Sequence, residues 1–183
     1  MTNKDILEWI KKYISPDIKK AFLARPGSLY TEDLLAGIAC RETGELIARY
    51  VPLKNDEVTV CALLRGDYNQ RKGDLEKMYH GYGITQIDID SFPDFVHSGK
   101  WKNPYECFVK TIDVLNGKKD YISSKFPMLW GADLIEYIVA AYNCGEGNET
   151  KIISNGEDTD AYDTGHDYAK AVLQFAEIYK NLP

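Results

Sequence analysis

Hydrophobic residues recur three and four positions apart along most of this chain, a spacing that predicts amphipathic helices. The first predicted helix covers 3–14 and ends at Ser15-Pro16, and a shorter one follows it up to Pro26-Gly27. We interpret 1–27 as an N-terminal helical buttress without identifiable chemistry. Further helices are predicted at 104–115, 121–126 and 133–142, with a final one that carries 168–179.

The predicted helix 31–44 combines clear boundaries with a charged residue near its apolar face. Thr31 can cap the N-terminus, and Gly44 offers a stop at the other end. Glu42 lies on or beside the face that enters the core. Burial there would raise the pKa of its carboxyl group, so that the group could hold a proton and act as a general acid. The alternative is a Glu in a fraying last turn that reaches solvent or pairs with Arg41.

Two segments are candidates for β structure. Residues 57–64 could form a strand or a buried helix, since the period of their apolar positions fits both. Residues 81–90 are predicted to form a strand and hairpin, in which Gln86 and Asp88 point to one face and line a polar cleft. The alternative is an edge strand with one solvated side. The stretch 65–74 between them is polar and turn-prone.

The remaining connections are interpreted as loops. They are 91–104, the glycine-rich 144–147 and the acidic 156–163, which we expect to be a solvated surface loop. Thr164 and Asp167 form a capping-box-like start for the final helix. The buried face of that helix is predicted to carry Tyr168, Val172, Phe175 and Tyr179.

Length and composition indicate one globular domain, 1–183, with 44% apolar and 27% charged residues. No apolar run approaches membrane-spanning length, and the first residues lead into an amphipathic helix rather than a secretory signal. Four scattered cysteines and three scattered histidines indicate neither a disulfide framework nor a metal site. The net charge of −6 argues against nucleic-acid binding and provides no long-range attraction to anionic polymers.

Four short motifs occur in one order along the chain. They are Arg-Glu-Thr at 41–43, Gly-Tyr-Gly-Ile-Thr-Gln-Ile-Asp at 81–88, Ala-Tyr-Asn-Cys-Gly at 141–145 and Asp-Tyr-Ala at 167–169. This set resembles goose-type lysozyme, in which a helix ending Arg-Glu-Ser precedes Gly-Phe-Gly-Leu-Met-Gln-Val-Asp, Ala-Tyr-Asn-Ala-Gly and a helix with Asp-Tyr-Ala. It is similar, more loosely, to the lytic transglycosylases that share that fold. The resemblance covers about 31–179, most of the chain.

The resemblance implies a mainly helical α+β, lysozyme-like fold with a small β-hairpin forming one wall of the cleft, and a catalytic core at 31–180. The implied activity is that of a muramidase, which cleaves the β-1,4 bond between N-acetylmuramic acid and N-acetylglucosamine of peptidoglycan without a metal or organic cofactor. The expected partner is the glycan strand at the cell wall, and the expected state is a monomer. The alternatives are a lytic transglycosylase, which gives 1,6-anhydro products, and an inactive glycan-binding module.

By the same resemblance, Glu42 matches the general acid, and Asp88 matches an aspartate implicated in orienting or activating water. Asp67 is the candidate for the second aspartate of the family, because Gly66-Asp67 resembles its Gly-Asp, and Asp74 is the competing choice. The matching sugar-contact positions are Gln86, Tyr142, Asn143 and Tyr168. Tyrosines at such core-facing spacing are also common packing residues with a satisfied hydroxyl.

Two positions depart from the family pattern. Phe92 stands where the family often has a histidine, which puts the sugar contacts of one subsite in doubt, and Cys144 stands where alanine is usual.

Both aspartate candidates lie far from Glu42 in sequence, which permits the wide carboxyl separation of an inverting hydrolase. Our hypothesis is hydrolysis with inversion, which such a separation permits without establishing it.

Overall fold

The computed structural model describes residues 1–54, 56–68, 79–163 and 165–183. Within these ranges the protein is mainly helical with a small antiparallel sheet, as the sequence predicted. The α-helices are α1 (Asn3–Trp9), α2 (Ser15–Ala24), α3 (Glu32–Tyr50), α4 (Glu57–Cys61), α5 (Pro93–His97), α6 (Pro104–Lys125), α7 (Gly131–Cys144), α8 (Glu146–Asn155) and α9 (Tyr168–Lys180). The strands are β1 (Arg65–Tyr68), β2 (Tyr79–Tyr82) and β3 (Ile87–Asp88), and short π or 3-10 segments are η1 (Ile10–Ile14), η2 (Val51–Leu53) and η3 (Lys100–Lys102).

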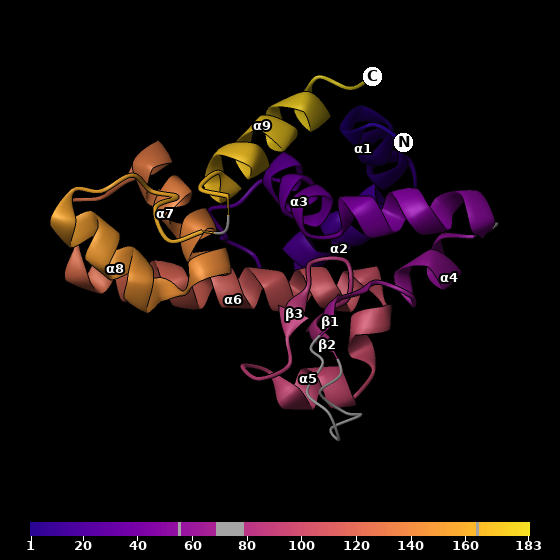
Figure 1. Ribbon diagram of the computed structural model, residues 1–183, viewed down its shortest axis with the longest axis horizontal. Helices are drawn as coiled ribbons and strands as arrows, with labels where there is room; N and C mark the ends of the chain where they lie inside the picture. The colour runs from indigo at the N-terminus through magenta and orange to yellow at the C-terminus, as the bar shows by residue number, and fades with distance from the viewer. Residues whose placement is uncertain (55, 69–78, 164) are drawn as a thin grey trace.

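The helix α3 lies at the centre, with α9 packed along it and α6 passing beneath it (Figure 1). Its N-terminus forms as predicted, because the Thr31 hydroxyl accepts a hydrogen bond from the Leu34 amide. The helices α3 and α9 cross closely at Gly37. A Cβ atom there would lie 2.5 Å from the carbonyl oxygen of Val172, so the crossing requires glycine at this position.

The buried hydrophobic residues of the N-terminal helices and of the later helices belong to one cluster. Ile10 from η1, Ile38 from α3, Phe108 from α6 and Ile138 from α7 are all fully buried in it. The segment 1–27 therefore packs on the same core as the rest of the chain. Among the described residues, no helix is long and apolar enough to cross a bilayer.

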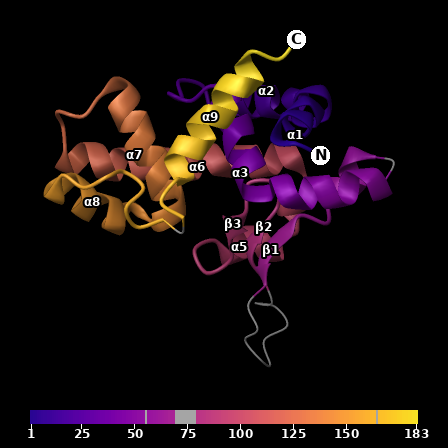
Figure 2. The same ribbon diagram turned by 45° about the horizontal axis from the view of Figure 1, so that its top comes forward.

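The sheet has the order β1-β2-β3 and projects from the helical part beside α5 (Figures 1 and 2). The turn between β2 and β3 is tied to three helices. The Thr43 hydroxyl of α3 donates to the Ile84 carbonyl (3.0 Å), the Tyr142 hydroxyl of α7 donates to the Thr85 carbonyl (2.7 Å), and the Thr111 hydroxyl of α6 donates to the Thr85 hydroxyl (2.7 Å). These bonds fix the sheet relative to the helices that carry the candidate site.

Three predicted helix ends are wrong. The helix α3 runs past Gly44 to Tyr50, since the cost of a single glycine, about 1 kcal/mol, does not end a long helix. The chain stays helical through Pro16, which lies in the first turn of α2, directly after the π segment η1. The helix α6 continues through Gly117 as one element, since a single glycine costs a long helix only about 1 kcal/mol.

Several segments expected to be loops contain helices. The segment 91–104 contains α5 and η3, and α8 begins directly after Gly145. The segment 57–64, for which the sequence left a strand and a buried helix open, contains the helix α4. Gly145 has a φ of 83°, which breaks α7 from α8 at one residue. The glycines at this one-residue break gave the sequence the composition of a longer loop.

The acidic segment 156–163 is only in part the solvated loop that we expected, because residues 156–158 are exposed, whereas Asp160 and Asp163 are buried. The start of α9 depends on this burial. The Asp160 carboxylate accepts hydrogen bonds from the backbone amides of Ala169 (2.7 Å) and Lys170 (3.3 Å). It therefore caps the N-terminus of α9, although it lies several residues before the helix in the sequence. Thr164, half of the predicted capping box, lies outside the described residues.

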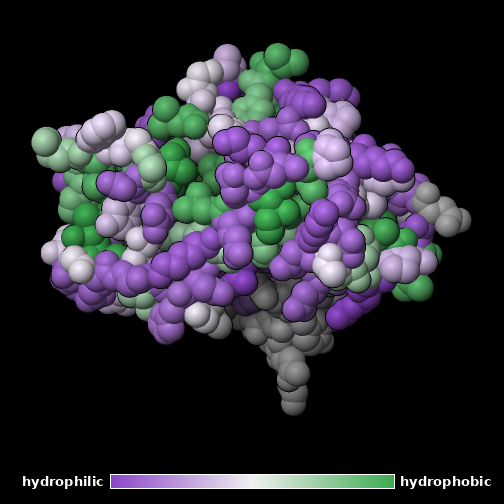
Figure 3. Space-filling view, turned by 90° about the horizontal axis from the view of Figure 1, so that it is seen from above, coloured by the Kyte–Doolittle hydropathy of each residue, from purple (hydrophilic) through white to green (hydrophobic). Residues whose placement is uncertain are grey.

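The connection between α6 and α7 exposes two large hydrophobic side chains, Met128 (86% exposed) and Trp130 (81% exposed). On the face seen from above, hydrophilic side chains are widespread, and hydrophobic ones show between them in the middle and at the top as well as at the left (Figure 3). Trp130 precedes α7, whereas Tyr142 lies in its last turn, roughly 18 Å further along at 1.5 Å per residue. This exposed apolar pair is therefore separate from the candidate site described below.

Candidate active-site groove

Glu42 lies well inside α3, with two further turns of helix after it, and is half-buried. The prediction that it occupies a fraying last turn is therefore excluded. The hydroxyl of Tyr168, the first residue of α9, donates a hydrogen bond to Glu42 Oε1. Arg41 donates instead to Asp167 (2.7 Å) and places its guanidinium over the Tyr168 ring. The first and fourth sequence motifs thus meet in space.

Tyr168 is a buried residue with a definite hydrogen-bonding role, being only 3% exposed. Burial, and then the neighbouring charge of Glu42, raise the pKa of its phenol well above the usual value. The hydroxyl therefore keeps its proton and acts as a donor to Glu42. This bond orients the carboxyl group, and it requires that α3 and α9 keep their close crossing.

Glu42 faces a groove made of two joined parts. The larger part has a volume of about 510 Å³ and is lined by Arg41, Glu42, Glu45, Leu46, Gly66, Gln86, Asn143 and Tyr168. The smaller part has a volume of about 320 Å³ and is lined by Gln86, Ile87, Asp88, Ser91, Phe92, Val114, Lys118, Tyr142, Asn143, Cys144, Gly145 and Glu146. Gln86 and Asn143 line both parts, so the two form one elongated groove.

Gln86 lies at the junction of the two parts, in the turn between β2 and β3 and not in a strand. The predicted alternation that placed it beside Asp88 on one strand face is therefore wrong, although both residues line the smaller part. Its φ of 51° is unusual for a residue other than glycine. Its side-chain amide donates to the Gly83 carbonyl (2.8 Å).

Two glycines make room for the Gln86 side chain. A Cβ atom at Gly81 would lie 2.5 Å from Gln86 Oε1, and one at Gly66 would also collide with that atom. Gly66 and Gly81 are directly paired across β1 and β2. The glutamine amide is thus packed over the sheet as a fixed part of the groove floor.

Asp88 lies at the end of β3 with its side chain 43% exposed. Its Oδ2 accepts bonds from the Ser91 amide (2.9 Å) and the Ser91 hydroxyl (2.6 Å), and its Oδ1 accepts one from the Asp90 amide (3.2 Å). These local bonds orient the carboxylate. Asp88 lines the smaller part of the groove, whereas Glu42 lines the larger.

Tyr142 and Asn143 have different roles, although they are adjacent. The Tyr142 hydroxyl donates to the Thr85 carbonyl, and burial and the nearby Glu42 charge raise the pKa of its phenol. It therefore supports the turn as a neutral packing residue, which is the alternative that the sequence left open. Asn143 is exposed and lines both parts of the groove, where its amide can reach a ligand.

The other aspartate candidates are only partly placed. Asp67 lies in β1 next to Gly66, which lines the larger part, but its side chain is not among those that the structure describes. Asp74 lies outside the described residues. Asp90, just after β3, is near His80, with 3.7 Å between His80 Nδ1 and Asp90 Oδ2.

Two lysines near the smaller part were missed by sequence reasoning. Lys118 of α6 is only 13% exposed in its side chain and forms an ion pair with Glu146 (3.0 Å) at the α8 start. It was overlooked because the helix was expected to end at Asn116-Gly117. Lys110 places its ammonium 3.6 Å from the ring centre of Phe92, which also lines the smaller part. This end of the groove therefore carries cations that the motifs did not indicate.

Comparison of the whole chain with protein-family models and with curated proteins finds no match. The resemblance to goose-type lysozyme therefore depends on the four motifs themselves. Residues from all four of them, Arg41 and Glu42, Gln86, Asn143 and Tyr168, line the larger part of one groove.

Proposed function

We propose that this protein is a muramidase-type glycoside hydrolase, which cleaves the β-1,4 bond between N-acetylmuramic acid and N-acetylglucosamine in peptidoglycan. The observation that carries the proposal is the position of Glu42, half-buried in an elongated groove and oriented by the Tyr168 hydroxyl. Four motifs that are distant in sequence supply the surrounding residues. We also propose that the helices and small sheet form a lysozyme-like fold, with β2 and β3 as one wall of the groove.

The shape and chemistry of the groove suit a chain of sugars. Its two joined parts, of about 510 and 320 Å³, provide room for more than one sugar unit along the groove. Amide groups at the junction, from Gln86 and Asn143, can bond to hydroxyl and acetamido groups. The net charge of −6 offers no general attraction to a polyanionic wall, so recognition would come from these short-range contacts.

In the proposed mechanism, a protonated Glu42 donates its proton to the glycosidic oxygen as the bond breaks. Partial burial favours the protonated form of a carboxyl group, and the Tyr168 hydroxyl holds the group in one orientation. Asp88 would activate a water molecule that attacks the sugar from the opposite face, with inversion. Such a pair of carboxyl groups is expected to stand roughly 6.5–9.5 Å apart. Asp67 remains the candidate for an additional carboxylate.

One observation favours a second candidate function, that of a lytic transglycosylase. Asp88 lines the other part of the groove, and its carboxylate already accepts two bonds from Ser91. If Asp88 activates no water, Glu42 would act alone, first as acid and then as base, while the 6-hydroxyl of the sugar closes a 1,6-anhydro ring. A third alternative is an inactive module that only holds glycan strands.

Clearance of a suspension of purified peptidoglycan tests the proposal. The native protein should lower the turbidity at a rate proportional to its concentration. A folded protein that binds the walls and never clears them would favour the binding module over both enzymes. The mass of the released fragments separates the two enzymes, because anhydro ends are lighter by one water.

A further inference from the structure

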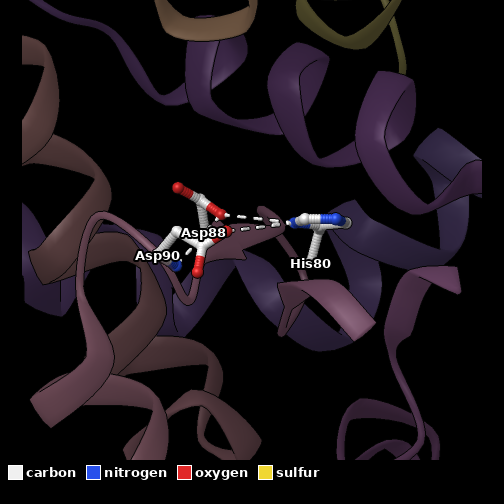
Figure 4. A group of neighbouring side chains, drawn as sticks. All are labelled: His80, Asp88 and Asp90. Carbon is white, nitrogen blue, oxygen red and sulfur yellow. Dashed lines mark hydrogen bonds and ion pairs between the residues drawn. The ribbon is translucent and has the colours of Figure 1, made fainter. Parts of the chain in front are cut away.

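His80 from β2 and Asp88 and Asp90 from the β3 end form a compact group beside the groove, beneath α3 (Figure 4). One ligand atom from each side chain lies within 4.8 Å of the other two. Figure 4 shows both carboxylates pointing toward the imidazole ring. The group is brought together by pairing of β2 with β3, in which the Ile89 amide donates to the His80 carbonyl (2.9 Å).

The distances in this group are too long for direct hydrogen bonds and suit a bridging ion. His80 Nδ1 lies 3.7 Å from Asp90 Oδ2 and 4.0 Å from Asp88 Oδ1, whereas an N–H···O bond spans about 2.7–3.2 Å. A zinc ion bonded to nitrogen and oxygen at about 2.0–2.2 Å separates its ligand atoms by roughly 3 to 4 Å. Small side-chain rotations would bring the three atoms to that spacing.

The surroundings of the group fit a metal site in two further respects. The Ser91 hydroxyl donates a hydrogen bond to Asp88 Oδ2, and Oδ1 of the same carboxylate faces His80. In metal sites, hydrogen-bonding partners outside the ligands orient the ligands in the same way. The three side chains are between 37% and 43% exposed, so that an ion can enter and water can complete its coordination.

We propose that His80, Asp88 and Asp90 bind a divalent transition-metal ion, with Zn²⁺ as the best match. The imidazole distinguishes the group from an ordinary acidic surface cluster, because a nitrogen ligand selects zinc over Mg²⁺ and Ca²⁺, which prefer oxygen ligands alone. The bound ion would hold Asp88 Oδ1 and withdraw it from the groove. On the proposed function, on which this consequence rests, zinc would therefore slow cell-wall lysis.

Calorimetric titration of the reduced protein with Zn²⁺ tests the site without reference to activity. We expect one ion bound more tightly than about 0.1 mM. His80→Ala and Asp90→Asn should each weaken binding at least about tenfold, since loss of even an outer-shell partner costs about that much. His97→Ala, an exposed histidine of α5, and Cys144→Ser, the half-buried thiol of the groove, should leave the affinity unchanged.

NMR of the imidazole side chains gives a second measurement, because the chain has three histidines. One equivalent of Zn²⁺ should shift the His80 ring and leave His97 and His166 unchanged. Circular dichroism of each variant checks that it is folded. If the His80→Ala protein does not fold, the Asp90→Asn protein is used for the comparison. Binding weaker than about 0.1 mM, binding unchanged in a folded His80→Ala or Asp90→Asn protein, or a shift at another histidine overturns the proposal.

Lysis assays separate this proposal from the proposed function. Zinc should slow lysis by the native protein and affect Asp90→Asn at least about tenfold less at the same concentration. If the protein binds zinc through His80 but never lyses cell walls, the metal site is supported and the proposed muramidase activity is refuted. Lysis that saturating zinc leaves unchanged would refute the withdrawal of Asp88.

Discussion

The two ends of the groove hold their carboxyl groups in different ways. Glu42 is carried by the interior of a long helix, is half-buried, and accepts a bond from the buried hydroxyl of Tyr168. Asp88 ends a two-residue strand, has a 43% exposed side chain, and is oriented by bonds from Ser91 within the same loop. These different surroundings support the roles that we propose, with Glu42 as the proton donor and Asp88 as the carboxylate that activates water.

The largest expected effect comes from removing the proton donor at the buried end. Glu42→Gln keeps the shape and the bond from Tyr168 but loses the acidic proton, so wall lysis should fall by at least a factor of about 100. Glu8→Gln, in an exposed ion pair of α1, is the matched control and should retain full activity. Near-normal lysis by folded Glu42→Gln protein would remove Glu42 from the mechanism.

A smaller loss is expected at the exposed end. If Asp88 polarises the attacking water, Asp88→Asn should lower turnover about 10- to 100-fold with little change in glycan binding, because the contact is made mainly in the transition state. Asp90→Asn, measured without zinc, should be nearly silent. If Asp90 proves the sensitive residue, the roles of the two aspartates are reversed. If neither variant loses activity, the transglycosylase becomes the better description.

The stability of the fold should also depend on pH through two buried acids, Glu149 of α8 and Asp163 in the segment before α9. Burial raises the pKa of Glu149 to about 8, and burial and the neighbouring Asp160 raise that of Asp163. A carboxyl group with a raised folded-state pKa binds a proton that the unfolded chain releases. Its stabilising effect is complete below the ordinary pKa of 4.5 and is lost as the pH rises through about 8.

The free energy of unfolding should therefore decline between about pH 5 and pH 8, and Glu149→Gln should reduce the slope by up to about 1.4 kcal/mol per pH unit. Urea unfolding at several pH values measures this slope. Glu157→Gln, an exposed glutamate of the same region, should leave it unchanged. Equal slopes in the native and Glu149→Gln proteins would contradict the burial of a protonated Glu149.

The sequence predicted the helical character and much of the core, because these depend on local periodicity. The Thr31 cap of α3 and the apolar stripe that contains Ile38 are both confirmed. Local stop signals failed at Gly44 and Gly117. Both glycines lie inside long helices, where the cost of one glycine, about 1 kcal/mol, is too small to end the helix.

The site was predictable in its residues more than in its geometry. Glu42 and Asn143 were selected from the motifs and line the groove, but the placement of Gln86 in a turn depends on a positive φ that strand alternation does not reveal. The proximity of His80 to Asp88 and Asp90 arises from strand pairing. Asp160 is buried because its carboxylate bonds to the backbone at the start of α9, whereas an acidic stretch in the sequence predicts exposure to solvent.

We propose that the groove cleaves glycan strands with Glu42 as the acid, and mass spectrometry of the products released from purified peptidoglycan can check this role. The native protein should release fragments that end in reducing N-acetylmuramic acid, at a rate at least about 100 times that of Glu42→Gln. Fragments lighter by one water would show that the reaction is transglycosylation instead of hydrolysis. The absence of any glycan cleavage, or equal release by the Glu42→Gln protein, would contradict the proposed role of Glu42 as the acid.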